Sequence, residues 1–207
     1  MSGTKQYDRN DLLDRAIELF RRQGYSDTST AELVDELGVN RKSMYAEFGS
    51  KQGLFEAALE RYDRENLSRV LAPIEAPAAG VDAIRSAFLG YAAASEGWER
   101  GRGCLLCNTA VERAALDPGA ARHVANYLER LTNAFRHALA NGQRAGDIAA
   151  DADLDGLAAF FTSSLIGVAA CIRAEADSAI VHAACDVINA TIAHNAPDAT
   201  ASSTAAP

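Results

Sequence analysis

Apolar residues recur at helical spacing through nearly the whole of this 207-residue chain, and this periodicity restricts the fold more than any other feature. The first instance is Leu13, Ala16, Ile17 and Phe20, which follow the i, i+3, i+4, i+7 order of one face of an amphipathic helix. Alanine, the best helix former, is abundant, whereas β-branched runs with a period of two are nearly absent. The sequence therefore predicts an all-α protein.

Capping residues and glycines divide this pattern into about nine predicted helices. Ser29 and Glu32 have the Ser-x-x-Glu spacing of a capping box, and Gly24 and Gly38 stand where glycine commonly ends a helix. The predicted helices cover residues 10–22, 29–37, 40–47, 50–73, 81–95, 104–116, 118–142, 157–173 and 180–192. The second and third are short and joined by a tight turn, which is the geometry of a helix-turn-helix.

We divide the chain into three segments on this basis. Residues 1–50 are predicted to form a three-helix helix-turn-helix domain, residues 51–195 a larger helical domain, and residues 196–207 a disordered tail of small and polar residues. The polar N-terminus has no apolar core of a secretion signal, and the uncharged run 157–172 is about one turn too short for a bilayer-spanning helix. We expect a cytoplasmic protein without a membrane partner, and reduced thiols in its four cysteines.

The charge balance excludes one class of nucleic-acid binder. The chain has 20 Lys and Arg against 28 Asp and Glu, a net charge of −8 and a pI near 5.0. A protein that coats nucleic acid without specificity gains its affinity by neutralising phosphates and should be basic. Most of the negative charge lies after residue 55, since residues 1–55 are close to neutral.

Three cations stand at unfavourable helix positions. Arg41 and Lys42 fall in the first turn of the third predicted helix, and Lys51 in the first turn of the fourth, where the helix dipole disfavours positive charge. They are explained if an anion such as a phosphate backbone docks there, because backbone N–H groups and basic side chains then converge on it. From charge alone, a solvated surface explains them equally well.

Residues 24–55 resemble the DNA-binding segment of TetR-family transcriptional regulators. The positions that match the family pattern are Gly24, Tyr25, Thr28, Ser29, Leu33, Val34, Gly38, Val39, Met44, Tyr45, Phe48, Ser50, Lys51 and Leu54. The helix lengths and the apolar last two helices also suit the family, so the resemblance extends over about residues 9–194. It implies a DNA-binding regulator, most often a repressor, whose second domain binds an effector and dimerises.

The resemblance also implies DNA contacts at matching positions. They are Thr28, Ser29, Tyr45 and Lys51 on phosphates, and Arg41, Lys42 and Ser43 in the major groove. Arg41 is the best candidate for a bidentate contact to a guanine edge. Val39, Met44 and Phe48 are assigned to the core of the small domain. Glu47 departs from the family, where an aromatic residue or His is common, and it either adds no affinity or reads a cytosine amine.

The last two predicted helices are the candidate dimer interface. Residues 157–172 are apolar almost all round and residues 180–192 have a clear apolar stripe, so two copies can form a four-helix bundle about a twofold axis. A dimer reads two half-sites of a palindromic operator, which gives useful affinity. The alternative is that both helices are only the core of a monomer.

The resemblance places an effector pocket among the middle helices. Its candidate lining residues are Phe88, Tyr91, Trp98, Leu105, Asn108, Tyr127, Leu131, Phe135, Phe161 and Ser164, although residues of these types are more often plain core than ligand contacts. Their composition favours a small, largely hydrophobic molecule. Such an effector releases the DNA by favouring a state whose two reading heads no longer match the operator.

Cys104 and Cys107 suggest a competing mode of regulation. They lie one helical turn apart near a predicted helix start, and Arg100 and Arg102 stand beside them, so a thiolate and a lowered pKa are expected at Cys104. The alternatives are an electrophile- or oxidant-sensing repressor and a pair of small buried hydrophobes. Cys171 and Cys185 lie on apolar stripes and are assigned to packing.

No pattern in the chain predicts catalysis or a cofactor. The four histidines form no nucleophile or metal-ligand pattern, the cysteines lack zinc-site spacing, and there is no phosphate-binding glycine loop. We therefore predict that the protein is not an enzyme and has no metal. A helical small-molecule-binding protein without DNA function is the remaining alternative.

Overall fold

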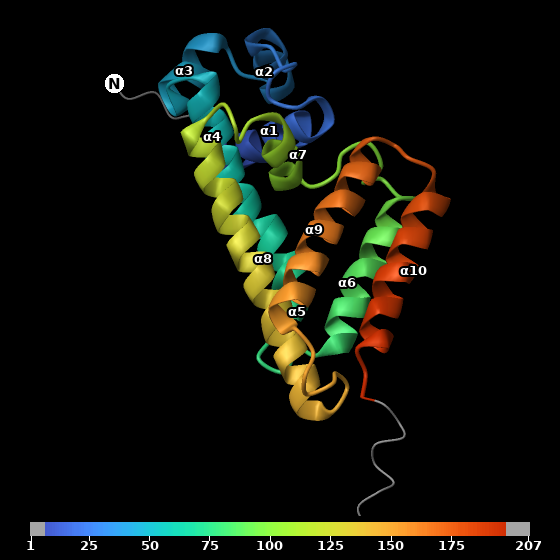
Figure 1. Ribbon diagram of the computed structural model, residues 1–207. Coiled ribbons are helices and arrows are strands. Elements are labelled where there is room, and N and C mark those ends of the chain that lie inside the picture. The colour runs from blue at the N-terminus through green and yellow to red at the C-terminus, as the bar shows by residue number, and fades with distance from the viewer. Residues whose placement is uncertain (1–6, 198–207) are drawn as a thin grey trace, which may run out of the picture. The chain divides into compact units, whose positions relative to one another are not determined.

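The computed structural model describes residues 7–197, and every regular element in that range is a helix (Figure 1). The elements are α1 (Arg9–Gln23), α2 (Thr30–Leu37), α3 (Arg41–Phe48), α4 (Lys51–Arg61), η1 (Tyr62–Leu67), α5 (Ser68–Glu75), α6 (Val81–Ala94), α7 (Leu105–Glu112), α8 (Pro118–Ala145), α9 (Leu154–Arg173) and α10 (Ser178–His194). Because α4, η1 and α5 follow one another without a break, they form one helical stretch. The described chain thus has nine helical stretches, and the predicted all-α class is confirmed.

The chain folds into two compact units. Unit 1 comprises the chain up to Arg69 together with Gly101–Tyr127, and unit 2 comprises Val70–Arg100 together with the chain from Leu128 onward. Unit 1 therefore contains the helix-turn-helix segment and also η1, α7 and the first part of α8. The predicted boundary after residue 50 divides the chain by expected function, whereas these units divide it by contacts, so that boundary stays a prediction. Most of the predicted tail, residues 198–207, lies outside the described residues.

The helix starts of unit 1 follow from their caps. Ser29 and Glu32 form both hydrogen bonds of the predicted capping box at the start of α2. The side chains of Asn40 and Ser50 accept from the backbone N–H groups of Ser43 and Gly53 and cap α3 and α4. These caps satisfy N–H groups that have no partner inside a helix. They define where α2, α3 and α4 begin.

Helix α7 is shorter than predicted. It ends at Glu112 rather than near residue 116, and the chain makes a turn there because Asp117 caps α8 by accepting from the backbone N–H of Gly119 at 2.8 Å. The two helix axes cannot be continuous when a capping residue stands between them. This corner, residues 112–117, belongs wholly to unit 1.

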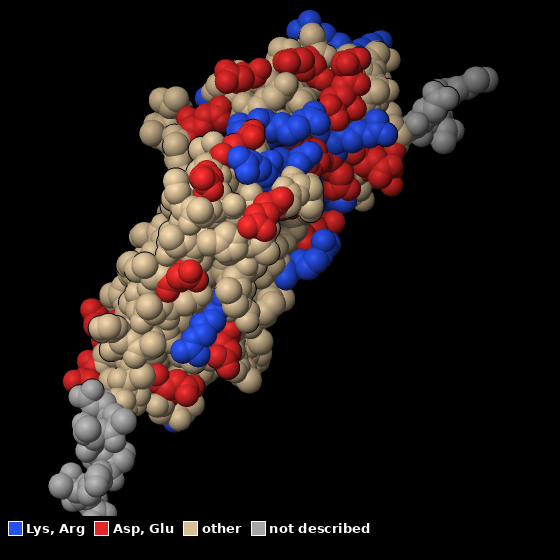
Figure 2. All heavy atoms as spheres, turned by 90° about the vertical axis from the view of Figure 1, so that its right-hand side faces the viewer, with Lys and Arg blue, Asp and Glu red and all other residues tan. Residues whose placement is uncertain are grey.

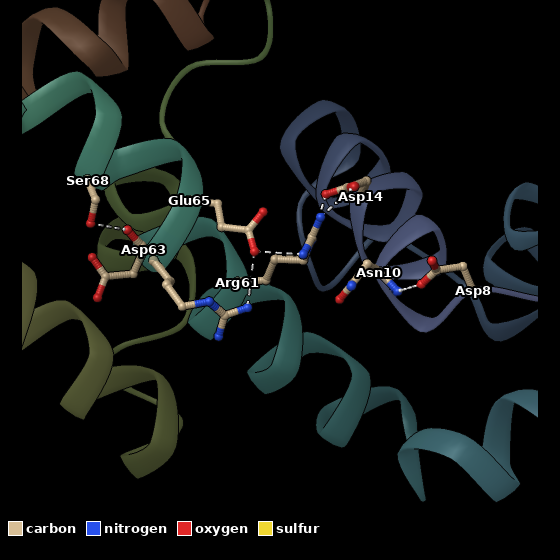
Figure 3. A network of polar contacts seen from close by, with 8 residues as sticks. Asp8, Asn10, Asp14, Arg61, Asp63, Glu65 and Ser68 are labelled. Atoms are coloured by element: carbon tan, nitrogen blue, oxygen red, sulfur yellow. Dashed lines mark hydrogen bonds and ion pairs between the residues drawn. The ribbon is translucent and has the colours of Figure 1, made fainter.

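A buried arginine joins α4 to α1 within unit 1 (Figure 3). The guanidinium of Arg61 donates to both carboxylate oxygens of Asp14, at 2.7 and 2.8 Å, and to Glu65 at 2.8 Å. Arg61 directly precedes η1, where the hydroxyl of Ser68 donates to the carbonyl of Asp63. The bidentate pair fixes the angle between the two helices as well as their distance.

Unit 2 is built around aromatic side chains. Phe88 on α6, Phe135 on α8 and Phe161 on α9 are fully buried and contact one another, with ring centroids 5.7 to 6.1 Å apart. Helix α10 packs against α6 and α9, and all three lie side by side in Figure 1. The hydroxyls of Thr132 and Thr162 lie 3.0 Å apart, and each is also within hydrogen-bond distance of a carbonyl one turn earlier, that of Leu128 or Ala158, so neither hydroxyl lacks a partner.

Helix α9 is longer than the uncharged run indicates. Its 20 residues, Leu154–Arg173, are long and apolar enough to cross a membrane by length and composition, whereas the uncharged run 157–172 by itself is too short. The same is true of core helices in proteins outside membranes. In the lower part of Figure 2, which shows unit 2 from the side where α10 lies in Figure 1, most of the surface belongs to uncharged residues.

Candidate nucleic-acid interface

The start of α3 carries an exposed pair of cations. Arg41 and Lys42 occupy its first turn and are exposed, no acidic residue shares that turn, and Asn40 caps it through a 2.8 Å bond from the backbone N–H of Ser43. The dipole of α3 and the two side chains all attract an anion to the same place. Ser43 is half-buried beside them.

Arg41 is held in place by Tyr45, one turn further along α3. Its guanidinium carbon lies 5.5 Å from the centroid of the Tyr45 ring, and Nη2 donates to the Tyr45 hydroxyl at 3.4 Å. This hydrogen bond is the main cause that lowers the pKa of Tyr45. Arg41 also borders an open depression lined by Thr30, Ala31, Val34, Asp35 and Gly38. The pairing limits the conformations of Arg41 before any partner binds.

Lys51 stands at the start of α4, as its sequence position predicts. It is half-buried, and its Nζ lies 4.2 Å from the centroid of the Tyr25 ring, so it makes a cation–π contact. Burial lowers the pKa of Lys51, and the nearby Glu112 carboxylate opposes that effect. The ammonium group therefore has a defined position rather than a freely solvated one.

At the start of α2, the side chain of Ser29 is exposed, whereas that of Thr28 is buried. Ser29 is exposed and caps α2, and the hydrogen bond from its backbone N–H to Glu32 is the main cause that lowers the pKa of Glu32. Thr28 is fully buried, and its hydroxyl donates to the carbonyl of Gly24 at 2.5 Å. The predicted phosphate contact of Thr28 is corrected on this ground, because the hydroxyl is used inside the fold and has no path to a phosphate.

Glu47 supports the fold and does not reach a base edge. Its side chain is 7% exposed, it pairs with Arg9 at 3.3 Å, and it accepts from the Tyr7 hydroxyl at 3.4 Å. The suggestion that Glu47 reads a cytosine amine is therefore wrong, since the carboxylate points to the chain before α2. Met44 and Phe48 are buried as predicted, whereas Val39 is only half-buried.

The ten candidate effector residues do not gather in one unit. In unit 2, Phe88, Leu131, Phe135 and Phe161 are buried, Tyr91 and Ser164 are half-buried, and Trp98 is 65% exposed. Leu105, Asn108 and Tyr127 belong to unit 1. The amide of Asn108 donates to the carbonyl of Arg102 at 2.8 Å, so its polarity is explained within the fold.

Cys104 and Cys107 are buried neighbours at the start of α7. A hydrogen bond from the Cys107 thiol is the main cause that lowers the pKa of Cys104 to about 6, with smaller contributions from backbone amides and the Tyr62 hydroxyl. The expected lowering of the Cys104 pKa is thus present, but its main causes are these hydrogen bonds rather than Arg100 and Arg102, and Arg102 is paired with Glu18 at 3.3 Å. Sharing this hydrogen bond, together with burial, raises the pKa of Cys107.

The other two cysteines and the potential metal ligands form no site. Cys185 is buried, which raises its pKa, and Cys171 is half-buried on α9. Within residues 7–197, no three His, Cys, Asp or Glu side chains come together as metal ligands. Sequence reasoning missed Glu112, Arg113 and Asp117, which surround Tyr25 and Lys51 from the α7–α8 corner. No local pattern marks them, because their partners lie 65 to 88 residues away.

Comparisons with known proteins agree with this interface. The family model for bacterial regulatory proteins of the tetR family matches residues 12–58, and the tetracyclin repressor-like C-terminal domain model matches residues 80–188. The chain is 32% identical to the uncharacterized HTH-type transcriptional regulator YezE of Bacillus subtilis over 86% of this chain and 92% of YezE. It is 48% identical to the HTH-type transcriptional repressor ComR of Escherichia coli over 58 residues, 28% of each chain.

A solved structure extends the likeness to the full fold. The TetR family transcriptional regulator CifR, as a cysteine mutant complexed with double-strand operator DNA, matches with a TM-score of 0.77 and 26% identity. The match covers 90% of this chain and 98% of CifR.

Proposed function

The chain belongs to the TetR family of DNA-binding transcriptional regulators, and from this premise we propose that it is a ligand-responsive repressor that binds a palindromic operator as a homodimer. The observation that carries the proposal is the set of cations at two neighbouring helix starts, with Arg41 braced by Tyr45 and Lys51 by Tyr25. In this proposal Arg41, Lys42 and Ser43 enter the major groove, and Ser29, Tyr45 and Lys51 contact phosphates.

The proposed dimer forms through α9 and α10. Large apolar side chains stand exposed on these helices: Phe160 at 40%, Ile180 at 60% and Val187 at 66%. Ile180 and Val187 are two turns apart, so they lie on one face of α10, and the residues exposed between them are Ala183 and Asp186. A face with large exposed apolar side chains is expected to be covered by a partner, and a second copy completes a four-helix bundle.

The dimer has its own test. Val187→Asp places two charges close to the proposed twofold axis and is expected to give a monomer in sedimentation or light scattering. Val70→Asp is the matched control, since Val70 is 57% exposed on α5 and should leave the mass unchanged. A dimer that persists in Val187→Asp contradicts the proposed interface.

The proposed effector is a small, largely hydrophobic molecule. Support comes from the apolar interior of unit 2, where Phe88, Phe135 and Phe161 are buried against one another, and from the few polar groups near it, such as the Thr132–Thr162 pair. Such a molecule releases the operator only if it prefers the state that binds DNA poorly. We place the protein in the cytoplasm, where such an operator is accessible.

Selection from random duplex DNA tests the proposed function. The purified, reduced protein should enrich a palindromic site, and fluorescence anisotropy across a salt series should give a steep salt slope because several phosphates are contacted. The control is Arg41→Ala with Lys42→Ala, which should remove the enrichment. No enrichment by the wild-type protein would favour the helical binding protein without DNA function.

Electrophile or oxidant sensing through Cys104 and Cys107 is a second candidate. It is favoured by the lowered pKa of Cys104, which favours the thiolate form of this buried side chain near neutral pH, and by the second thiol directly beside it. Oxidation of the wild-type protein should release DNA, and Cys104→Ser should abolish that response. An unchanged response in Cys104→Ser ends this alternative.

A further inference from the structure

We propose that Glu112 is a positioning residue for DNA binding: its carboxylate, at the end of α7, holds the α1–α2 turn and Lys51 in the geometry that meets the phosphate backbone. This inference rests on the proposed DNA contacts of Ser29 and Lys51 and identifies what keeps them in place. All the residues involved belong to unit 1.

Glu112 bonds to the backbone of the turn that leads into α2. One carboxylate oxygen accepts from the N–H of Tyr25 at 3.0 Å and the other from the N–H of Ser26 at 2.6 Å. Backbone N–H groups require a partner, and a carboxylate that accepts two of them fixes the path of the chain between them. The turn is thus oriented by a residue that lies far away in the sequence.

Gly24 provides the space that this contact needs. It ends α1 with a φ of 86°, and a Cβ at this position would lie 2.6 Å from Oε2 of Glu112. Any other residue therefore meets two separate obstacles, a strained backbone and a collision with the carboxylate. The close approach of Glu112 is built into the turn.

Tyr25 carries the effect of Glu112 to Lys51. The Tyr25 ring contacts Phe55, with centroids 4.8 Å apart, and receives the Arg113 guanidinium at 4.3 Å and the Lys51 ammonium at 4.2 Å. Since the Tyr25 backbone is held by Glu112 and its ring by Phe55, the ring is a fixed support for Lys51. A shift of the turn moves that support.

Asp117 closes the same corner onto the start of α4. It accepts from Arg113 at 3.0 Å and from Gln52 at 2.5 Å, and Gln52 directly follows Lys51. Residues 112–117 thereby hold both helix starts that the proposed function assigns to phosphate. Helices α7 and α8 flank this segment, and Glu112 is the last residue of α7.

Substitution of Glu112 tests whether its main effect on DNA binding is to position the turn and Lys51 or to repel phosphates by its charge. Removing a negative charge near DNA should by itself strengthen binding, since the carboxylate repels phosphates. If Glu112 positions the turn, Glu112→Gln instead weakens binding about tenfold and lowers the salt slope by about one contact, because Lys51 loses its place. The control Glu60→Gln removes the same charge from an exposed site on α4 and should bind at least as well as the wild type.

The measurement is the anisotropy of a labelled duplex recovered by selection with the wild-type protein, at several salt concentrations and well below the melting temperature of each variant. Equal or tighter binding by Glu112→Gln overturns the proposal, and so does weaker binding with an unchanged salt slope. A wild-type protein that recovers no duplex contradicts the proposed function instead.

A double-mutant cycle with Gly24 keeps the proposal testable if a single variant folds poorly. Gly24→Ala should weaken DNA binding strongly, and adding Glu112→Ala should cost little more, because the collision has already displaced the carboxylate. Additive losses from the two substitutions overturn the coupling between Gly24 and Glu112.

Discussion

Both units have an apolar core, but they differ in the polar contacts that accompany it. Unit 1 adds directional polar contacts between distant residues to its buried apolar side chains, such as Arg61 with Asp14 and the buried Arg21 with the carbonyl of Gly103. Unit 2 depends chiefly on apolar packing, and its Arg130–Glu75 pair is partly exposed. Hydrogen bonds fix angles and register, whereas apolar contacts are non-directional. The proposed phosphate contacts require fixed positions, which the first kind of contact supplies, and the proposed effector binding requires apolar surface, which the second supplies.

The largest effect should come from the core of unit 2. Phe161→Ala removes a fully buried ring that contacts Phe88 and Phe135 and should lower the free energy of unfolding by about 3–5 kcal/mol. Thermal denaturation followed by circular dichroism measures it. The control Phe160→Ala acts on a 40% exposed neighbour and should cost much less. Equal losses would mean that unit 2 is not organised around this cluster.

A smaller loss is expected from the polar framework of unit 1. Arg61→Met keeps much of the side-chain volume but loses the bonds to Asp14 and Glu65, and should lower the free energy of unfolding by about 1–3 kcal/mol. Both acceptors are largely exposed and return to water, which limits the cost. Urea denaturation with Arg64→Met as the exposed control measures the difference. A loss as large as that of Phe161→Ala would remove the distinction between the units.

The interface itself should divide into specific and unspecific contacts. Arg41→Ala should weaken binding to the selected operator by about 1–3 kcal/mol and relax its specificity, because it removes a base contact. Lys51→Ala should weaken binding to all sequences alike and reduce the salt slope by about one contact. Competition binding with operator and unrelated duplexes distinguishes them. Equal losses on every duplex for both variants would refute this division.

Local signals in the sequence were enough to predict α2 and α3, the two helices of the helix-turn-helix. The Ser29–Glu32 capping box, the Asn40 cap and the helical spacing act within one or two turns, so they determine α2 and α3 without knowledge of the rest of the fold. The same local reasoning placed Arg41 and Lys42 on the surface and Met44 in the core.

Contacts between distant residues could not be predicted in this way. Thr28 has the residue type of a phosphate contact, but it is fully buried in the folded chain and its hydroxyl donates to the carbonyl of Gly24. Glu47 pairs with Arg9, and Glu112 with the turn at Tyr25, through distances that only the folded chain defines. Helical periodicity identifies the buried face of a helix and does not identify the residue that it meets.

The smallest expected effect is a difference in thiol ionisation between a cysteine of unit 1 and a cysteine of unit 2. Cys104 in unit 1 has polar donors around it and a pKa lowered to about 6, whereas Cys185 in unit 2 has a pKa raised, first by burial and then by Asp186. As the pH rises through about 6, one thiolate should therefore appear in the ultraviolet absorbance of the folded protein. Cys104→Ser should remove that step and Cys185→Ser should not.

The same titration predicts the direction of a stability change. The pKa of Cys104 is lower in the folded protein than the value of about 8.5 for an unfolded thiol, so the folded state binds fewer protons between these values. The contribution of Cys104 to the free energy of unfolding is complete above the unfolded pKa and is lost as the pH falls to about 6. Cys107→Ala removes the main hydrogen bond to Cys104, so it should move the absorbance step to higher pH and weaken this dependence. A step that stays near its wild-type pH in Cys107→Ala would show that another group stabilises the thiolate.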